Sequence, residues 1–194
     1  TPALAPGVRR REVWAWAMYD FANSGYTTIV ITAVFNAWFV SGIARNAQWA
    51  TLSWTSALSV SYALIMATAP ALGAWADAHA AKKRLLLTTT VGCVAATAAL
   101  ALAGPGDVVL ALVLVVVSNY FFGSGENLVA AFLPELASAD GLGRVSGWGW
   151  ALGYVGGLVS LALSLGWLAW AEAHGVANEA AVPVTLVITA LLSA

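Results

Sequence analysis

Charged residues are scarce in this chain: Asp, Glu, Lys and Arg make up only 9% of its 194 residues, whereas 61% are hydrophobic. So low a share of charge excludes an ordinary soluble domain. The eight basic residues form no cluster interleaved with aromatic rings, so we expect no nucleic-acid partner. The composition indicates that most of the chain lies in lipid.

Cysteine is nearly absent as well. The single cysteine, Cys93, lies in an apolar run and has no second cysteine with which to form an internal disulfide. We expect it to be a small buried apolar residue. The sequence contains no phosphate-binding glycine loop, nucleotide motif or metal-ligand spacing. We therefore expect no cofactor, no metal and no enzyme activity.

Long apolar stretches, by contrast, fill the chain. A bilayer core is about 30 Å thick and takes roughly 20 helical residues to cross, and backbone amides in lipid must be satisfied within the spanning element. The sequence therefore predicts an all-α membrane protein, a bundle of six transmembrane helices. We place the spans at residues 14–42, 50–76, 84–104, 108–133, 146–171 and 181–194.

Both ends of the chain look cut. The first residue is Thr1 instead of methionine, and the last span reaches only from 181 to 194, which is shorter than a full crossing. We therefore expect residues 1–194 to form an amino-terminal six-helix transmembrane domain that is a piece of a longer protein.

Basic residues are unevenly divided between the two sides of the predicted bundle. If the spans alternate in direction, seven of the eight fall on one side and only Arg45 on the other. The seven are Arg9, Arg10, Arg11, Lys82, Lys83, Arg84 and Arg144. Because basic loops remain in the cytoplasm, the pattern predicts a multi-pass protein of the cytoplasmic membrane with a cytoplasmic N-terminus.

Polar side chains form a stripe on each of two spans. In the first span Asp20, Asn23, Ser24 and Thr27 recur at helical spacing, and in the fourth span Asn119, Gly123, Glu126 and Asn127 do the same. Both carboxylates lie roughly 10 Å below the inner surface at 1.5 Å per residue. Ionisable residues within spans usually face a bundle interior or a water-filled cavity. We predict one substrate or proton pathway lined by Asp20, Asn23, Asn119, Glu126 and Asn127.

Each carboxylate also has a structural interpretation. Asp20 could be an interfacial aspartate near the positively polarised start of its helix, and Glu126 could make a plain hydrogen bond to a neighbouring helix. Gly149, Gly153 and Gly157, four residues apart in the fifth span, predict close packing against another helix. That contact would be either a static seam or a surface on which helices rock.

The loop between the second and third spans reads GAWADAHAAKK over residues 73–83. It resembles the signature loop of the major facilitator superfamily, in which Gly73, Asp77, Lys82 and Lys83 would form a gate loop. The glycine would permit tight helix contact, and the aspartate would cap the next helix and pair with cations. Ala78 and Ala80 depart from the pattern, because the family often has arginine and glycine there.

Three further stretches resemble signatures of the vacuole effluxer-like branch of that superfamily. They are WAMYDFANSGY (16–26), NLVAAFLPEL (127–136) and SGWGWALGYVGG (146–157). The resemblance implies a secondary transporter of twelve helices, working by alternating access between two six-helix halves. This chain would then lack the carboxy-terminal half. Its expected partners are the lipid bilayer, a small polar solute and protons; an amino acid is the candidate solute because characterised relatives export amino acids from vacuoles.

Two alternatives remain open. A half-carrier fragment would be unable to transport alone. An intramembrane serine hydrolase is suggested by Gly123-Ser124-Gly125, which is similar to the serine motif of rhomboid-type proteases. Such an enzyme needs a histidine within reach of the serine, but His79 and His174 lie in predicted loops.

Overall fold

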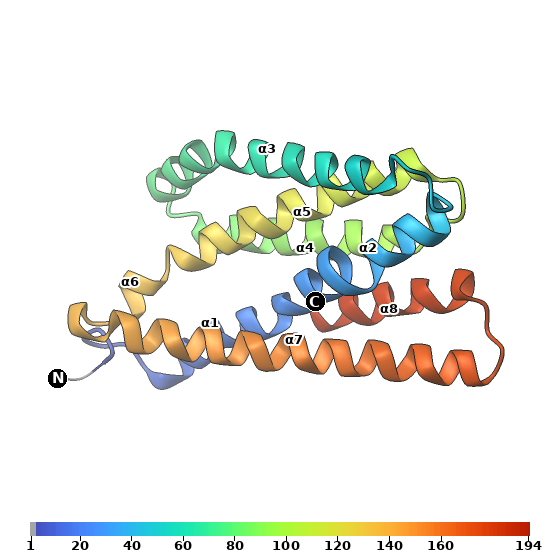
Figure 1. The fold of residues 1–194 in the computed structure, drawn as a ribbon. Helices are drawn as coiled ribbons and strands as arrows, with labels where there is room; N and C mark the ends of the chain where they lie inside the picture. The colour runs from blue at the N-terminus through green and yellow to red at the C-terminus, as the bar shows by residue number, and fades with distance from the viewer. Residues whose placement is uncertain (1–2) are drawn as a thin grey trace.

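The computed structural model describes residues 3–194, which form a bundle of long helices (Figure 1). The first span is made of α1 (Arg10–Tyr26), the π-helical η1 (Thr27–Ala33), α2 (Phe35–Trp38) and the π-helical η2 (Phe39–Ile43). Then come α3 (Ala50–Ala78), α4 (Lys82–Leu100), α5 (Val108–Ala130) and the short α6 (Leu133–Leu136). The 3-10 helix η3 (Ala139–Gly141), α7 (Leu142–Ala173) and α8 (Asn178–Leu192) complete the chain.

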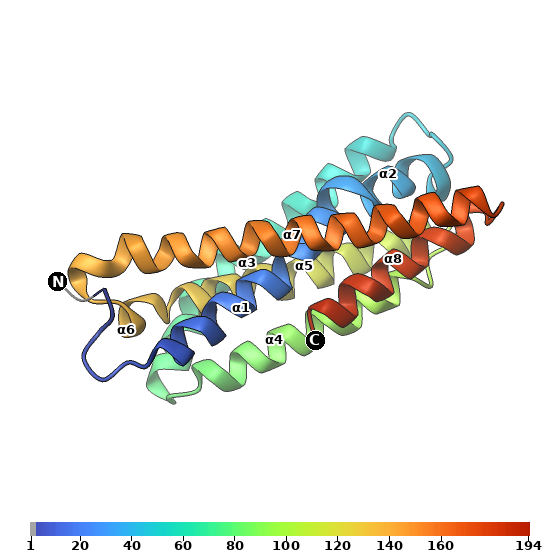
Figure 2. The ribbon, with the colours of Figure 1, turned by 90° about the horizontal axis from the view of Figure 1, so that it is seen from below.

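Five helical segments are long and apolar enough to cross a membrane: Arg10–Ile43, Ala50–Ala78, Lys82–Leu100, Val108–Leu136 and Ala139–Ala173. The sixth, α8, has 15 residues and ends partway along the bundle (Figure 2). The predicted all-α helical bundle is thereby confirmed. Each predicted span overlaps one helical segment, and the largest difference at a boundary is the start of the fifth, at Ala139 where residue 146 was expected.

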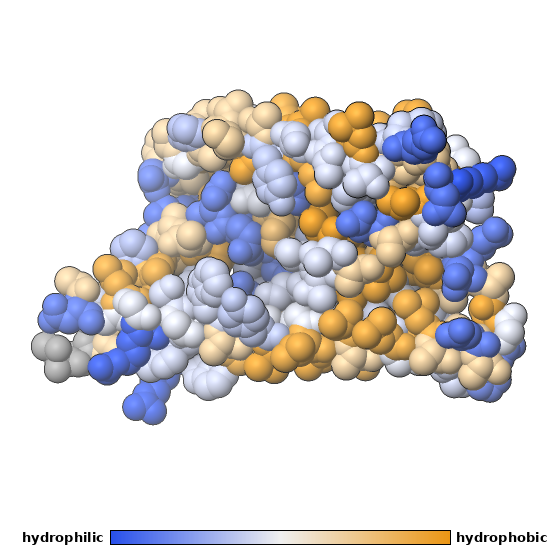
Figure 3. Space-filling model, viewed as in Figure 1, coloured by the Kyte–Doolittle hydropathy of each residue, from blue (hydrophilic) through white to orange (hydrophobic). Residues whose placement is uncertain are grey.

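The outer surface of the bundle is apolar, as expected where lipid is the solvent. Leu52, Met66 and Leu102 are 69%, 77% and 77% exposed. Hydrophilic residues gather at the two ends and in the hollow between α3 and α7 (Figure 3). In water these apolar side chains would favour aggregation, so the surface itself indicates a membrane environment.

The main apolar core surrounds the second half of the first span. Ile29, Phe35 and Phe39 are almost completely buried there, and the Phe39 ring lies 5.2 Å from that of Trp54 on α3. At the other end of the bundle a smaller cluster buries Val13, Ala137 and Val145.

Helices α1 and α7 run side by side in the same direction, and α5 packs between α3 and α4 (Figures 1 and 2). Glycines bring α1 and α7 together: a Cβ atom on Gly156 would collide with the backbone carbonyl oxygen of Phe21. A Cβ on Gly149 would lie 2.7 Å from the ring of Trp16. The glycine-rich face of α7 is thus turned toward α1.

One end of the bundle, on the left in Figure 1, collects the starts of α1 and α7 and the turn between α3 and α4. The seven basic residues grouped by the sequence lie on these segments, and Arg45 lies in the loop at the other end. The N-terminal segment is fastened to the same end, because the amide of Ala5 donates to the carbonyl of Leu136 and the amide of Ser138 donates to that of Ala3.

Candidate functional site

A cavity of about 410 Å³ lies between the first span, α5 and α7. Its polar lining comes from Asp20, Ser24, Thr27, Thr28 and Glu126. Its aromatic lining comes from Phe122, Trp150 and Tyr154. Three helices therefore contribute to one amphipathic chamber, which we call the carboxylate cavity.

The two carboxylates of this cavity reach it from different helices, Asp20 from α1 and Glu126 from α5. Asn23, which is 5% exposed, donates a hydrogen bond of 2.7 Å from its side-chain nitrogen to Glu126 Oε1. About two turns earlier in α1, the indole nitrogen of Trp16 donates to the carbonyl of Val129 over 3.0 Å. These two bonds fix the rotation of α1 relative to α5.

The neighbouring hydroxyl groups of the first span do not donate hydrogen bonds to the Asp20 carboxylate. The Ser24 hydroxyl donates to the carbonyl of Asp20 over 2.8 Å, and the Thr28 hydroxyl donates to that of Ser24 over 3.0 Å. Both hydroxyls thus bind the backbone carbonyl four residues earlier in their own span, as is common for Ser and Thr in membrane helices. The Asp20 carboxylate has no hydrogen-bond donor or ion-pair partner within residues 3–194.

Glycines of α7 provide the space for the carboxylate. A Cβ atom on Gly153 would lie 2.5 Å from Asp20 Oδ2, and one on Gly157 would lie 3.0 Å from the Thr28 hydroxyl. No Lys, Arg or His of the described residues lines this cavity. The ionisable groups of its lining are therefore all acidic, and the low dielectric of the surrounding helices strengthens the field of either carboxylate when it is ionised.

The structure gathers three of the five predicted pathway residues, Asp20, Asn23 and Glu126. Asn119 lies on another face of α5, fully buried against α3, where its nitrogen donates to the Ser61 hydroxyl over 3.1 Å. Asn127 lines a separate cavity of about 90 Å³. The sequence grouped these five residues from two helical stripes, one on each span. Asn119 and Asn127 of the second stripe face α3, because α5 packs between α3 and α4.

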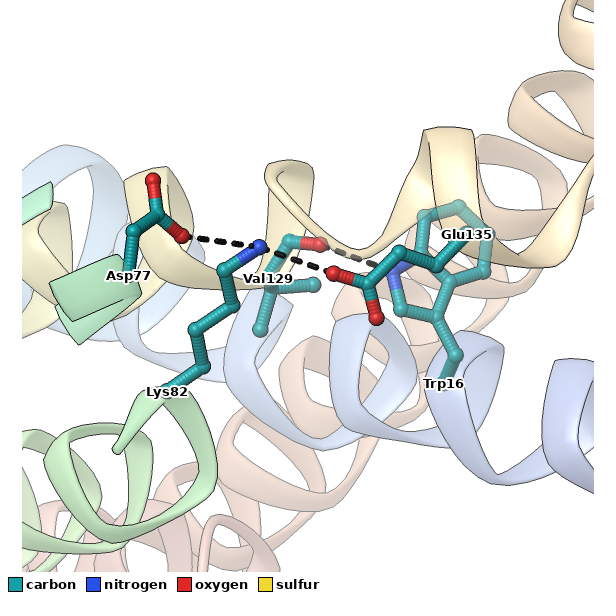
Figure 4. Close-up of polar contacts among 5 residues, drawn as sticks. All are labelled: Trp16, Asp77, Lys82, Val129 and Glu135. Atoms are coloured by element: carbon teal, nitrogen blue, oxygen red, sulfur yellow. Dashed lines mark hydrogen bonds and ion pairs between the residues drawn. The ribbon is translucent and has the colours of Figure 1, made fainter. Parts of the chain in front are cut away.

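The predicted gate loop adjoins that smaller cavity, which is lined by Gly73, Asp77 and Lys82. Lys82 Nζ lies 3.1 Å from Asp77 Oδ1 and 2.8 Å from Glu135 Oε1, so one ammonium bridges α3 and α6 (Figure 4). Lys83 makes no ion pair among residues 3–194. The role of Glu135 was not predicted, although its place on the same side as Lys82 was a usable signal.

Within residues 3–194 neither histidine is paired with Ser124, as the serine hydrolase alternative would require. The rings of His79 and His174 stack on Trp75 and Trp170 of their own helices, with centroids 4.7 and 4.3 Å apart. Each ring nitrogen Nδ1 is hydrogen-bonded to the carbonyl of that tryptophan, so neither histidine engages Ser124. Within residues 3–194 no group of three His, Cys, Asp or Glu side chains is arranged to hold a metal ion.

Comparison with known proteins gives two matches. Residues 52–194 match the family model described as vacuole effluxer Atg22 like. The chain is also 33% identical over 183 residues to a protein of Bacillus subtilis (strain 168) described as the uncharacterized MFS-type transporter YxiO. That alignment covers 91% of this chain and 42% of the relative, so the chain spans less than half the relative's length. No solved structure matches.

Proposed function

Because the chain belongs to the vacuole effluxer Atg22-like family of major facilitator transporters, we propose that it is the amino-terminal half of a secondary carrier. The carrier moves a small polar solute across the cell membrane by alternating access. The length of the bacterial relative supports a second half, because the aligned part of that relative is only 42% of it.

The observation that carries this proposal is the meeting of Asp20 and Glu126 at one cavity. A carboxylate at the centre of a span costs about 2.5–3.5 kcal/mol on insertion scales. A purely structural carboxylate would offset that cost with partners inside the protein. Glu126 has Asn23, but Asp20 has no partner within residues 3–194. An unpartnered acid beside a cavity is instead suited to bind a solute or a proton.

The lining also indicates which part of a solute would be bound. Two carboxylates with no basic side chain attract an ammonium group, and the faces of Trp150 and Tyr154 add cation–π attraction. An amino acid carries such a group, so it stays the candidate substrate. Its carboxylate would need a cationic partner outside this cavity lining, for which the carboxy-terminal half is the candidate.

Protons are the proposed coupling ion. A carboxylate that faces the two sides of the membrane in turn can take up a proton on one side and release it on the other. Glu126 suits this role because the Asn23 amide holds its Oε1 atom and leaves the rest of the carboxylate at the cavity. The end with seven basic residues is the proposed cytoplasmic end. The ion pairs of Lys82 with Asp77 and Glu135, which we call the Lys82 cluster, would gate access there.

Uptake into proteoliposomes tests the proposal. The complete protein that contains this segment is reconstituted, and an imposed pH gradient drives uptake from a panel of labelled amino acids, amines and organic acids. We expect accumulation of at least one solute, and at least a tenfold loss of flux in Glu126→Gln and in Asp20→Asn. Glu179→Gln, at the start of α8, is the control and keeps the flux. Unchanged flux in both cavity variants would contradict the proposed site.

The half-carrier proposal has its own test. The reading frame beyond residue 194 is expected to encode six further membrane-spanning segments. A stop codon directly after that position, together with solute flux by the 194-residue chain alone, would show that no second half is needed.

A further inference from the structure

A second cavity, of about 760 Å³, is larger than the carboxylate cavity and shares no lining residue with it. Its lining comes from the first turns of α1 and α7 and from Ala3 and Leu4. Both helices begin at the same end of the bundle (Figure 2). On α7 it uses Trp148 and Ala151, whereas the carboxylate cavity uses Trp150 and Tyr154. We call this second cavity the α1–α7 groove.

The two helices present the groove with the same series of side chains at the same spacing. On α1 the series is Arg10, Trp14 and Ala17, and on α7 it is Arg144, Trp148 and Ala151. In both helices the residues stand at positions i, i+4 and i+7, which lie on one face about one turn apart. Because α1 and α7 run in the same direction, the two series form matching layers. The layers are cationic at the end of the bundle, then aromatic, then small and apolar.

The cationic layer is available to a ligand. Neither Arg10 nor Arg144 has an ion-pair partner within residues 3–194, although the adjacent Arg9 pairs with Glu12 at 3.4 Å. Arg10 and Arg144 both line this one cavity, and arginine binds phosphate with paired hydrogen bonds.

The deeper layers favour an amphiphile. Trp14 and Trp148 are 59% and 45% exposed despite their size, and tryptophan prefers the headgroup level of a bilayer. Beyond them the groove is lined by Ala17, Ala151 and Leu152. A free inorganic anion would contact only the arginines and leave this apolar part of the groove unused.

We propose that the α1–α7 groove binds an anionic phospholipid. The phosphate lies between Arg10 and Arg144, the glycerol and ester groups lie against the two indoles, and an acyl chain follows the alanines inward. Basic pockets between membrane helices are a known way of holding acidic headgroups. The groove shares no lining residue with the carboxylate cavity, so the lipid site is distinct from the proposed solute site.

Lipid binding by the purified protein tests this site. The protein in a nonionic detergent is titrated with phosphatidylglycerol or with phosphatidylcholine of the same acyl chains, and bound lipid is counted by native mass spectrometry. We expect phosphatidylglycerol to bind at least about tenfold more tightly, since each arginine near the headgroup adds roughly a fivefold preference. Inorganic phosphate at millimolar concentration is expected not to displace it.

Paired variants separate the groove from general charge. Arg10→Gln with Arg144→Gln is expected to lose most of the preference for phosphatidylglycerol. Arg11→Gln with Arg84→Gln removes the same charge from the same end outside the groove lining, and it is expected to keep the preference. Arg10→Lys with Arg144→Lys keeps the charge and is expected to keep part of the preference.

Three results would overturn the proposal. The first is equal binding of the two lipids by the unmodified protein, a result that needs no variant to fold. The second is displacement of the lipid by inorganic phosphate, which would make the groove a site for free anions. The third is an equal loss of preference in the groove pair and the control pair.

Discussion

Asn23 and Glu126 join the first and fourth spans through a single hydrogen bond of 2.7 Å, in which the amide donates to Glu126 Oε1. This contact holds the acid beside the carboxylate cavity and close to Asp20. It also makes the pair an amide–acid couple whose two members can be exchanged by mutation.

Exchanging the members of this couple tests whether the bond itself matters. Asn23→Asp places a second carboxylate against Glu126, and we expect the free energy of unfolding to fall by about 1.5–3 kcal/mol. The double variant Asn23→Asp, Glu126→Gln restores one amide and one acid, so most of that loss should be recovered. Thermal unfolding in detergent measures both effects. Losses that simply add would show that the two side chains act independently.

The contact of α1 with α7 predicts a strong contrast between two glycines of the same helix. A Cβ on Gly156 would collide with the carbonyl oxygen of Phe21, whereas one on Gly166 would meet nothing within 4 Å. We expect Gly156→Ala to lower the free energy of unfolding by about 1–3 kcal/mol because the backbones must separate. Gly166→Ala should be neutral or raise it by up to about 1 kcal/mol. Equal stability of the two variants would contradict the packing described.

The bridge made by Lys82 predicts a local effect on mobility. Lys82→Gln removes both ion pairs, to Asp77 and to Glu135. We expect faster hydrogen exchange in the turn between α3 and α4 and in α6, with little change elsewhere. Lys83→Gln, which loses no ion pair of the described residues, is the matched control. Because the cluster is partly exposed, 1 M salt should reduce the difference between the two variants.

The turn between α3 and α4 predicts a stabilising substitution. Ala80 has a φ angle of +47°, a left-handed conformation that glycine adopts without the strain on Cβ. We expect Ala80→Gly to raise the free energy of unfolding by about 1 kcal/mol. Ala81→Gly is the control, since its φ angle of −107° gives glycine no advantage. Thermal unfolding of the two variants should give shifts of opposite sign.

Hydropathy and charge were sufficient to predict the helices and their alternation, because a lipid solvent dictates both the length and the composition of a span. The distortion within the first span was not predictable in this way. η1 and η2 are as apolar as an ordinary helix, and π-helical hydrogen bonding depends on what packs against the helix. The backbone hydrogen bond from Ala5 to Leu136, which fastens the N-terminal segment to the bundle, was also not predicted. A backbone pairing of this kind leaves no pattern in the side chains.

The site was partly accessible from the sequence. Helical spacing was enough to bring Asp20 and Glu126 into consideration, and the structure places both at one cavity. Helical spacing does not show which face of α5 packs against which neighbouring helix. Asn119 was therefore grouped with Asp20 and Glu126, although it lies against Ser61 of α3. Glu135 was missed because its partner Lys82 is 53 residues away in the chain.

The backbone contact between Gly156 and Phe21 limits how the carboxylate cavity can change shape. Two helices that touch through their main chains cannot slide past one another without first separating, so α1 and α7 are expected to move together as one rigid body. The helix α5 is joined to α1 by side-chain hydrogen bonds, from Trp16 to Val129 and from Asn23 to Glu126. Such bonds can break and re-form at modest cost. The carboxylate cavity should therefore widen or narrow by movement of α5 relative to α1.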